Sequence, residues 1–421
     1  MKKSIFLSAL MLFSIISASA QDNELTLNAQ LRPRAEYRNG ALSPRNDGDL
    51  PAQFINSRAR LSALYKHDAL SVGFSAQNVG VWGQDPQVET SGRMMLNEAW
   101  ANLAFGKGFF LKLGRQTLSY DDDRILGSLD WNVSGRSHDA AKLGYESKTD
   151  KLHLIMAFNQ NSEKVIGGDY YASGGQPYKQ MQTLWYQHIG SKAFNASFLL
   201  MNLGFEAGES SNPNTKYLQT LGTNITWKPG DFQLYGTFYY QTGKTVADKS
   251  VAAWMGALNA SYQVTPAVKL TAATDYLSGD DTGDKYTAFN PLYGTHHKFY
   301  GTMDYFYASS FINGLNPGLW DNQLGAAFKT SSKVSLLLNY HYFLTATDVY
   351  SGDVKQARGL GSEIDFQLNW AVMPDVNLSA GYSTMLCSDA MKAVKGGDPK
   401  AWQDWCWVSL NITPKIFSSK W

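Results

Sequence analysis

The chain has 421 residues, an aromatic content of 13% and a formal net charge of +1 at pH 7. A near-neutral chain has no overall field that attracts nucleic acid, so any charge selectivity has to come from local patches. The mean hydropathy is −0.30, and beyond the N-terminus no apolar run approaches the roughly 18 residues of a membrane helix. Frequent aromatics, polar average character and alternating apolar positions are typical of a transmembrane β-barrel.

The N-terminus has the three parts of a secretory signal peptide. Lys2 and Lys3 form a basic segment, an apolar run covers residues 5–16, and an Ala-Ser-Ala sequence at 18–20 matches the cleavage pattern. The apolar run is too short to span a membrane comfortably as an uncleaved anchor. No cysteine follows the cleavage site, which excludes a lipoprotein. We therefore expect residues 1–20 to be removed near Ala20 and the mature chain to be exported.

From residue 25 onward the organising period is two residues. Between Leu25 and Tyr37, apolar residues occupy nearly every odd position and polar residues occupy the even ones. This alternation, over a length that spans a tilted bilayer crossing, predicts a barrel strand with apolar side chains outward and polar side chains inward. Pro33 lacks a backbone donor, so we expect a bulge or weakened pairing there.

Short turns and long loops alternate along the rest of the chain. About eight turns rich in Gly, Pro, Asp, Ser and Lys separate about nine longer loops, which predicts about eighteen strands. Bacterial barrels have even strand numbers, short periplasmic turns and long extracellular loops. We interpret residues 21–421 as a single all-β, transmembrane antiparallel β-barrel of the outer membrane. The loop at 279–317 is too long for an unstructured connector, so we expect it to fold over or into the lumen as a plug or constriction.

Basic residues gather on the predicted lumen face of the first two strands, about 25–38 and 53–66. They are Arg32, Arg34, Arg38, Arg58 and Arg60. Like charges on neighbouring strands repel, so the group requires a counter-charge or an anionic guest. Inward acidic residues offer the first, and they include Glu36, Glu98, Glu146, Asp275, Glu363 and Asp365. An internal salt-bridge network and a track for anions are both consistent with this pattern.

The most specific motif lies around the loop that follows the strand at 109–116. It comprises Gly-Arg-Gln at 114–116, Arg-Ile-Leu-Gly-Ser-Leu-Asp-Trp at 124–131 and Gly-Arg-Ser-His-Asp-Ala at 135–140. A later segment, 292–301, has the sequence Leu-Tyr-Gly-Thr-His-His-Lys-Phe-Tyr-Gly. These segments resemble the core motif and a later loop of the alginate export family. One departure is His138, where the family tends to have an aromatic residue.

The resemblance implies an eighteen-stranded outer-membrane barrel with an arginine-lined, anion-selective lumen, which in the best-known members passes the polyuronate alginate. The basic residues that would line or gate the path are Arg32, Arg34, Arg58, Arg60, Arg115, Arg124 and Arg136. The acidic residues of the path are Glu98, Asp130, Asp139, Glu363 and Asp365. Guanidinium groups match carboxylates bidentately, and a moving polymer requires several weak contacts instead of one tight site.

Arg115 does not fit the alternation. It shares its parity with Leu111 and Leu113, which are predicted to face lipid, where a charge is costly at the midplane. We expect either a bulge near Gly114 or a position above the bilayer.

No cofactor, metal site or catalytic centre is predicted. His296 and His297 are adjacent, and adjacent residues of a strand face opposite ways. The same argument separates the side chains of the Ser-His-Asp run at 137–139, so they cannot form a triad as they stand. A disulfide between Cys387 and Cys406 is permitted in an exported chain, although their parities disagree in a regular hairpin, and the sequence leaves this pairing open.

Three functions remain open from the sequence. The first is an outer-membrane channel for anionic oligo- or polysaccharides, working with periplasmic export or uptake partners. The second is a general or substrate-specific porin without uronate preference, and the third is a plugged barrel whose loops bind a partner. All three imply contact with outer-membrane lipid and with the barrel assembly machinery, whose substrates end in an aromatic residue such as Trp421.

Overall fold

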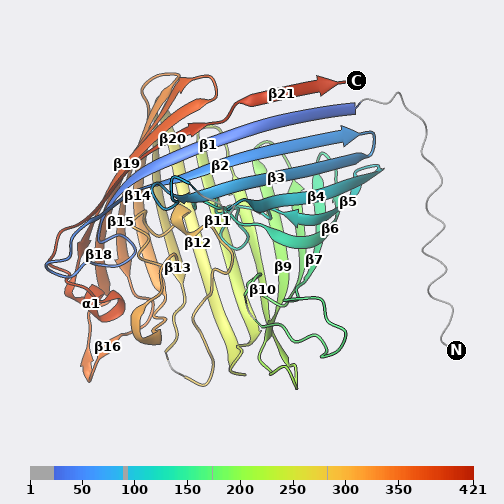
Figure 1. Cartoon of the computed structure of the whole chain (residues 1–421). Coiled ribbons are helices and arrows are strands. Elements are labelled where there is room, and N and C mark those ends of the chain that lie inside the picture. The colour runs from blue at the N-terminus through green and yellow to red at the C-terminus, as the bar shows by residue number, and fades with distance from the viewer. Residues whose placement is uncertain (1–22, 89–92, 173, 282) are drawn as a thin grey trace.

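Antiparallel strands form one closed sheet in the computed structural model, which describes residues 23–88, 93–172, 174–281 and 283–421 (Figure 1). The predicted signal peptide lies outside the described residues. The strands are β1 (Asn23–Asn39), β2 (Ala52–His67), β3 (Leu70–Val81), β4 (Met95–Gly106), β5 (Phe109–Gln116), β6 (His138–Glu146), β7 (Asp150–Phe158), β8 (Gln180–Ile189), β9 (Phe194–Glu206), β10 (Thr215–Trp227), β11 (Phe232–Lys244), β12 (Ser250–Thr265), β13 (Val268–Leu277), β14 (Leu319–Lys329), β15 (Val334–Leu344), β16 (Tyr350–Ser351), β17 (Val354–Lys355), β18 (Gly359–Met373), β19 (Val376–Cys387), β20 (Gln403–Ile412) and β21 (Lys415–Lys420).

The closed sheet has nineteen segments, of which β20 and β21 are two parts of one strand, and β16 with β17 forms a separate hairpin. The described chain therefore builds an antiparallel β-barrel of eighteen strands, which confirms the predicted all-β barrel and its strand number. The barrel closes because β1 pairs with β2 on one side and with β20 and β21 on the other. Short helical segments lie in the connections: η1 (His296–Lys298), η2 (Ile312–Gly314) and α1 (Asp389–Lys395). No helix among the described residues is long and apolar enough to cross a membrane.

The connections differ in length between the two ends of the barrel. One end, called here the short-turn end, has connections such as 68–69 and 107–108, and Asn23 and Trp421, the two ends of the described residues, lie there. The backbone N–H of Asn23 donates to the carbonyl of Trp421 at 2.9 Å, and the N–H of Trp421 donates back at 3.0 Å. The opposite end, the long-loop end, has connections such as 117–137 and 278–318.

Strand alternation separates an apolar outer wall from a polar inner wall, since successive side chains of a strand point to opposite faces. On β1 and β2, for example, Leu31 and Leu61 are 46% and 50% exposed, whereas Arg58 is 0% exposed and faces inward. The pairing of β1 with β20 has no partners for Arg32 and Pro33, although partners continue on both sides. This is the weakened pairing expected from the missing donor of Pro33.

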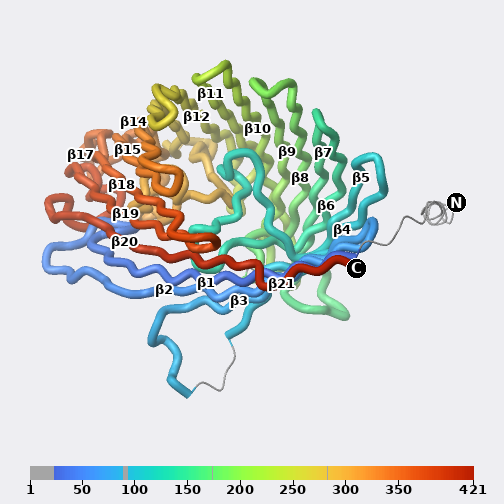
Figure 2. Tube along the Cα trace, turned by 90° about the horizontal axis from the view of Figure 1, so that it is seen from above, coloured from blue at the N-terminus to red at the C-terminus, as the bar shows by residue number. Residues whose placement is uncertain are grey.

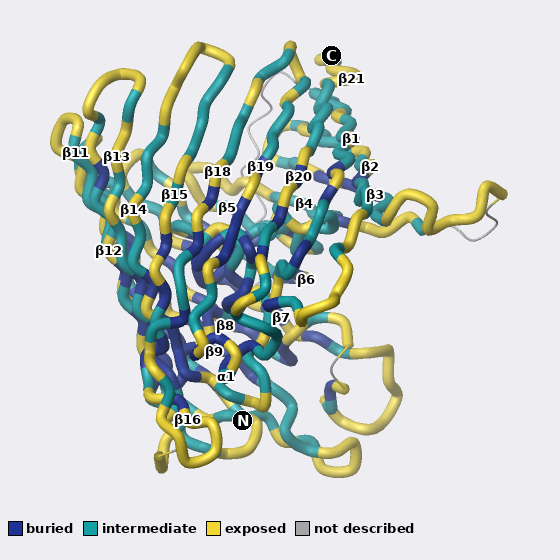
Figure 3. The backbone as a smooth tube through the Cα atoms, turned by 90° about the vertical axis from the view of Figure 1, so that its left-hand side faces the viewer, coloured by how far each residue is buried: buried dark blue, intermediate teal, exposed yellow. Residues whose placement is uncertain are grey.

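The hydrophobic core lies inside the barrel, where inward side chains of the strands pack against two inserted loops. The β5–β6 loop (117–137) and the β13–β14 loop (278–318) run within the ring of strands (Figure 2). Residues such as Leu126 and Phe306 in these loops are 1% exposed. The loops also pair with each other, since the N–H of Gly127 donates to Tyr293 at 2.9 Å and the N–H of Tyr293 donates to Ile125 at 3.0 Å. Buried residues consequently gather in the long-loop half of the barrel, and the short turns are exposed (Figure 3).

The two cysteines are not joined. Both are free, and in the register of β19 with β20 Cys406 lies opposite Tyr382, several residues along β19 from Cys387. Cys406 is exposed and Cys387 is half-buried. The disulfide that the sequence left open is therefore absent from this fold.

Candidate functional site

Two arginines on the inner wall share one carboxylate. Arg32 of β1 and Arg58 of β2 lie directly opposite each other in the strand register. Asp130, from the β5–β6 loop, accepts from both: Arg58 Nη1 lies 2.6 Å from its Oδ1, and Arg32 Nη1 lies 3.2 Å from its Oδ2. Like charges at opposite positions of neighbouring strands repel. The carboxylate of Asp130 offsets this repulsion between Arg32 and Arg58.

The rest of the β5–β6 loop continues along the same row of arginines. We call Arg32, Arg34, Arg58 and Arg60 the arginine ladder. Its guanidinium groups donate to backbone carbonyls of consecutive residues of the segment 130–134: Arg32 to Asp130 at 2.8 Å, Arg34 to Trp131 at 3.0 Å, Arg58 to Asn132 at 2.7 Å and to Val133 at 2.6 Å, and Arg60 to Ser134 at 3.4 Å. The arginine ladder thus holds an extended chain whose oxygens face it one after another.

A second carboxylate completes the balance at the long-loop end of the ladder. Glu36 accepts from Arg34 Nε at 2.8 Å and from Arg38 Nη2 at 2.7 Å, and Trp405 Nε1 donates to it at 3.2 Å. The predicted salt-bridge network is therefore present. The sequence had pointed to acidic residues of the strands as counter-charges, and it had named Asp130 as a residue of the path but not as the counter-charge of these arginines.

Arg124 is a buried clamp between the β5–β6 loop and the barrel wall. Its two terminal nitrogens bind both oxygens of Asp275 on β13, at 2.7 and 3.1 Å, and its Nε binds Asp122 at 2.7 Å. The guanidinium carbon lies 3.9 Å from the ring centre of Phe299. Burial opposes the charge, but the carboxylates of Asp275 and Asp122 outweigh it and raise the pKa of Arg124 well above its usual value. Arg124 therefore anchors a loop and does not line an open path.

Arg136 has a related structural role. Its Nη1 donates to the carbonyls of Tyr293 and Gly294 in the β13–β14 loop, the latter at 3.1 Å. Burial lowers the pKa of Arg136. It was predicted to line or gate the path, and in this fold it joins the two inserted loops, so its relation to the path is through the position of those loops.

The predicted path residues Arg115 and Asp139 lie on the other side of the wall. They are opposite each other in the register of β5 with β6 and form an ion pair of 3.0 Å. Their face is shared by Leu113 and Leu143, which are 44% and 45% exposed. Neither residue faces the lumen, so the prediction that they belong to its lining is wrong.

Strict alternation already pointed Arg115 outward, and the structure follows it. The pairing of β5 with β6 is regular through Gly114, so the bulge expected there is absent. Gly114 itself has a φ of +113°, and an added Cβ would lie 2.3 Å from the carbonyl oxygen of Ala99. Arg115 is instead accommodated near the long-loop end of β5, with Asp139 as its partner.

The remaining predicted acidic residues hold the inserted loops. Glu98 accepts the backbone N–H of Thr117 at 2.8 Å, at the start of the β5–β6 loop. Glu363, which is 0% exposed, accepts the N–H of Met303 at 2.7 Å. Asp365 accepts from Thr302 at 2.5 Å and lies 3.5 Å from His341 Nε2. These carboxylates bind the inserted loops to the barrel wall. They therefore do not pair with the arginine ladder.

Two histidine interpretations change in the structure. His296 and His297 belong to the short helix η1 and not to a strand, and the ring of His297 stacks on Trp131 with centroids 4.0 Å apart. Sequence reasoning missed this contact because it joins two loops far apart in the chain. His138 faces inward with its Nδ1 2.8 Å from Tyr178, away from Asp139. Within the described ranges no cluster of three metal-ligating side chains occurs.

Lys395 of α1 ties another connection to the β13–β14 loop. Its ammonium donates to Ser309 Oγ at 2.8 Å and to the carbonyl of Ser310 at 2.7 Å. Burial lowers the pKa of Lys395 to about 8. A lysine released to water titrates at about 10.4, so between those two pH values the undocked state binds more protons than the docked state.

The contact between α1 and the β13–β14 loop is therefore expected to strengthen as the pH rises from about 8 to about 10 and to change little below pH 8. Planar bilayer recordings should show fewer spontaneous openings over that range. Lys395→Met, which keeps the length of the side chain and removes its charge, should flatten the dependence. An unchanged slope in Lys395→Met would assign the effect to other groups.

The comparisons with known proteins bear on this arrangement. Residues 23–400 match the sequence profile described as Alginate export. The chain belongs to the alginate export family. The resemblance found in the motifs at 124–131 and 135–140 is thereby confirmed, and those motifs of the alginate export family flank or form the segment that lies along the arginine ladder. No curated protein matches the chain in sequence.

Solved structures share the fold of this alginate export family member at low identity. OccAB1 of Acinetobacter baumannii has a TM-score of 0.63 at 12% identity, over 93% of this chain and 97% of that one. OpdL of Pseudomonas aeruginosa has a TM-score of 0.62 at 14% identity, over 93% and 99%. A BenF-like porin from Pseudomonas fluorescens Pf-5 has a TM-score of 0.61 at 13% identity, over 93% and 99%. The likeness extends over whole barrels and concerns the fold.

Proposed function

We propose that the protein is an outer-membrane channel that passes anionic saccharides, of the polyuronate class, along the arginine ladder. Membership of the alginate export family and the porin-like barrel support a channel in the outer membrane. The exposed apolar outer wall supports insertion in a bilayer, since barrels alternate lipid-facing and lumen-facing residues. Bacterial barrels have short periplasmic turns and long extracellular loops, so on this proposal the short-turn end faces the periplasm and the long-loop end faces the outside of the cell.

One observation carries the proposal: the arginine ladder binds an extended chain through a series of oxygens. The segment 130–134 offers one carboxylate and successive carbonyls to four arginines. A polyuronate would offer a carboxylate on each residue in place of neutral carbonyls. Charge-assisted hydrogen bonds to carboxylates are roughly twice as strong as neutral ones, so such a polymer can compete with the loop.

On this proposal the two inserted loops constrict the lumen. The β5–β6 loop covers the arginine ladder, and the β13–β14 loop packs against it. Transport on this proposal requires the loops to shift so that the ladder exchanges its partner. Several contacts of moderate strength, spread along the wall, suit a polymer that has to keep moving.

The proposal is tested by the ion selectivity of the reconstituted protein. It should conduct in planar bilayers and prefer anions, and Arg58→Glu with Arg60→Glu should reduce or reverse that preference, because each change replaces a lumen cation by an anion. The control, Lys192→Glu with Lys228→Glu, makes the same change of charge in exposed short turns. A cation preference in the parent protein would contradict the proposal.

A porin without uronate preference is the second candidate, and the fold shared over full length with the BenF-like porin favours it. Block of the current by alginate oligomers but not by neutral oligosaccharides supports the first function. Equal effects of both support the second. If the parent protein conducts no ions and begins to do so after the β13–β14 loop is shortened, a plugged surface-binding barrel becomes the better description.

A further inference from the structure

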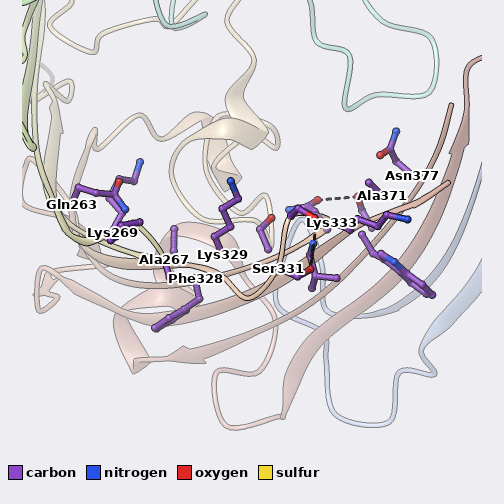
Figure 4. A pocket seen from close by; sticks show the side chains of 17 residues that line it. Gln263, Ala267, Lys269, Phe328, Lys329, Ser331, Lys333, Ala371 and Asn377 are labelled. Carbon is purple, nitrogen blue, oxygen red and sulfur yellow. Dashed lines mark hydrogen bonds between the residues drawn. The ribbon is translucent and has the colours of Figure 1, made fainter. Parts of the chain in front are cut away.

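Three lysines gather around a cavity at the short-turn end of the barrel. Lys269 of β13, Lys329 at the end of β14 and Lys333 in the following turn line a cavity of about 580 Å³ (Figure 4). The other polar residues of its lining are uncharged, mainly serines, asparagines and a glutamine. The cavity therefore combines three cations with hydroxyl and amide groups that can bind saccharide hydroxyls.

Alternation places Lys269 and Lys329 on the lumen side. Lys269 shares its parity on β13 with Asp275, and Lys329 shares its parity on β14 with Asp321, and both of these acids are buried inside the barrel. Figure 4 shows Lys329 on the side of the wall opposite to Phe328. The ammonium groups of Lys269 and Lys329 therefore point into the lumen and not toward lipid, and Lys333 lines the same cavity from the turn.

The lysines differ from the arginine ladder in being open to a solute. All three are exposed, no carboxylate lines the cavity, and none of the three forms an ion pair with the described part of the chain. The arginines of the ladder are instead occupied by Asp130, Glu36 and loop carbonyls. In this conformation an anionic guest meets available cations at the short-turn end first.

The cavity leads toward the inserted loops. A second cavity of about 210 Å³ shares Lys269 and Ala327 with the first and reaches Lys298 and Phe299 of the β13–β14 loop. The inner wall of β13 and β14 thus connects the short-turn end with the underside of the constriction.

We propose that Lys269, Lys329 and Lys333 form a carboxylate-binding subsite that receives a polyanionic saccharide at the short-turn end before the arginine ladder does. This rests on the proposed function and adds an entry site to it. Lysine is a compact, strongly hydrated point charge, whereas arginine binds carboxylates with a rigid fork. A lysine subsite consequently attracts carboxylates and exchanges them readily, as the first contact of a moving polymer should.

The test is current block of the full-length protein by a short alginate oligomer, added to either side of a planar bilayer. The test variant is the triple Lys269→Gln, Lys329→Gln and Lys333→Gln. The control triple is Lys148→Gln, Lys192→Gln and Lys228→Gln, which removes the same charge from exposed turns at the same end. The shift in electrophoretic mobility between unheated and heated samples checks that each variant forms a barrel.

We expect the test triple to weaken block from the short-turn side about tenfold, since each exposed ion pair contributes modestly, and to leave block from the opposite side much less changed. The control triple should block like the parent. Equal block by the parent and the test triple, or equal losses in the two triples, would overturn the subsite. Absence of block from either side, with no anion preference in the parent, would instead overturn the proposed function on which the subsite rests.

Discussion

Replacing residues 296–311 by a short Gly-Ser linker is expected to raise single-channel conductance at least roughly threefold, because an eighteen-stranded barrel without an inserted loop leaves an aqueous channel. The removed segment contains Tyr300, Met303, Tyr305 and Phe306, which are 0–1% exposed and belong to the hydrophobic core inside the barrel. The replacement also removes His297, whose ring stacks on that of Trp131. The β5–β6 loop would lose this support and the arginine ladder would be uncovered more often.

The matched control is a similar replacement of residues 350–355, which include the exposed hairpin of β16 and β17. That change should leave the conductance unaltered. If both replacements give the conductance of the parent protein, the β13–β14 loop does not limit the passage of ions. An increase with both would show that disturbing any long loop opens the barrel.

Arg124→Ala is expected to lower the free energy of unfolding by about 3 kcal/mol or more, because removing one partner of a buried ion pair leaves the other charge uncompensated. The side chains of Arg124 and Asp275 are 6% and 2% exposed, and the pair is bidentate. Denaturant unfolding in lipid measures the loss. Protease cleavage within 117–137 should rise in parallel, because Arg124 anchors this loop.

The double variant Arg124→Ala with Asp275→Ala separates the ion pair from packing. If the loss comes from an uncompensated charge, the double variant should be more stable than the sum of the two single losses predicts. Additive losses would show that Arg124 acts mainly through its contact with Phe299. Asp122→Ala, which removes a more exposed partner of the same guanidinium, should have a smaller effect.

The strand pattern and the inner wall could be predicted because the direction of a side chain in a strand is a local property. Period-two alternation placed Arg32, Arg34, Arg58 and Arg60 inward, and the structure agrees. The same rule pointed Arg115 outward, and the error arose where the family resemblance was preferred to the alternation. A motif identifies a family more surely than it assigns the face of each of its residues.

What the sequence could not predict depends on contacts between distant loops. Asp130 meets Arg58 across 72 positions of the chain, and no local pattern signals that a loop residue will supply the counter-charge. The stacking of His297 on Trp131 likewise depends on two loops entering the barrel together. Loop conformation is set by tertiary packing, whereas alternation is set residue by residue.

The closing contact of the barrel has a consequence for how the protein completes its fold. Across this contact β1 meets β21 with a shift of register between Leu27 and Asn28, and it meets β20 with no partners for Arg32 and Pro33. Before closure, β1 and β20 are free sheet edges, and free edges invite pairing with other chains. Irregular pairing in the middle of this seam makes these edges poor templates for a strand of another chain. We therefore expect the unclosed barrel to resist edge-to-edge aggregation with other chains.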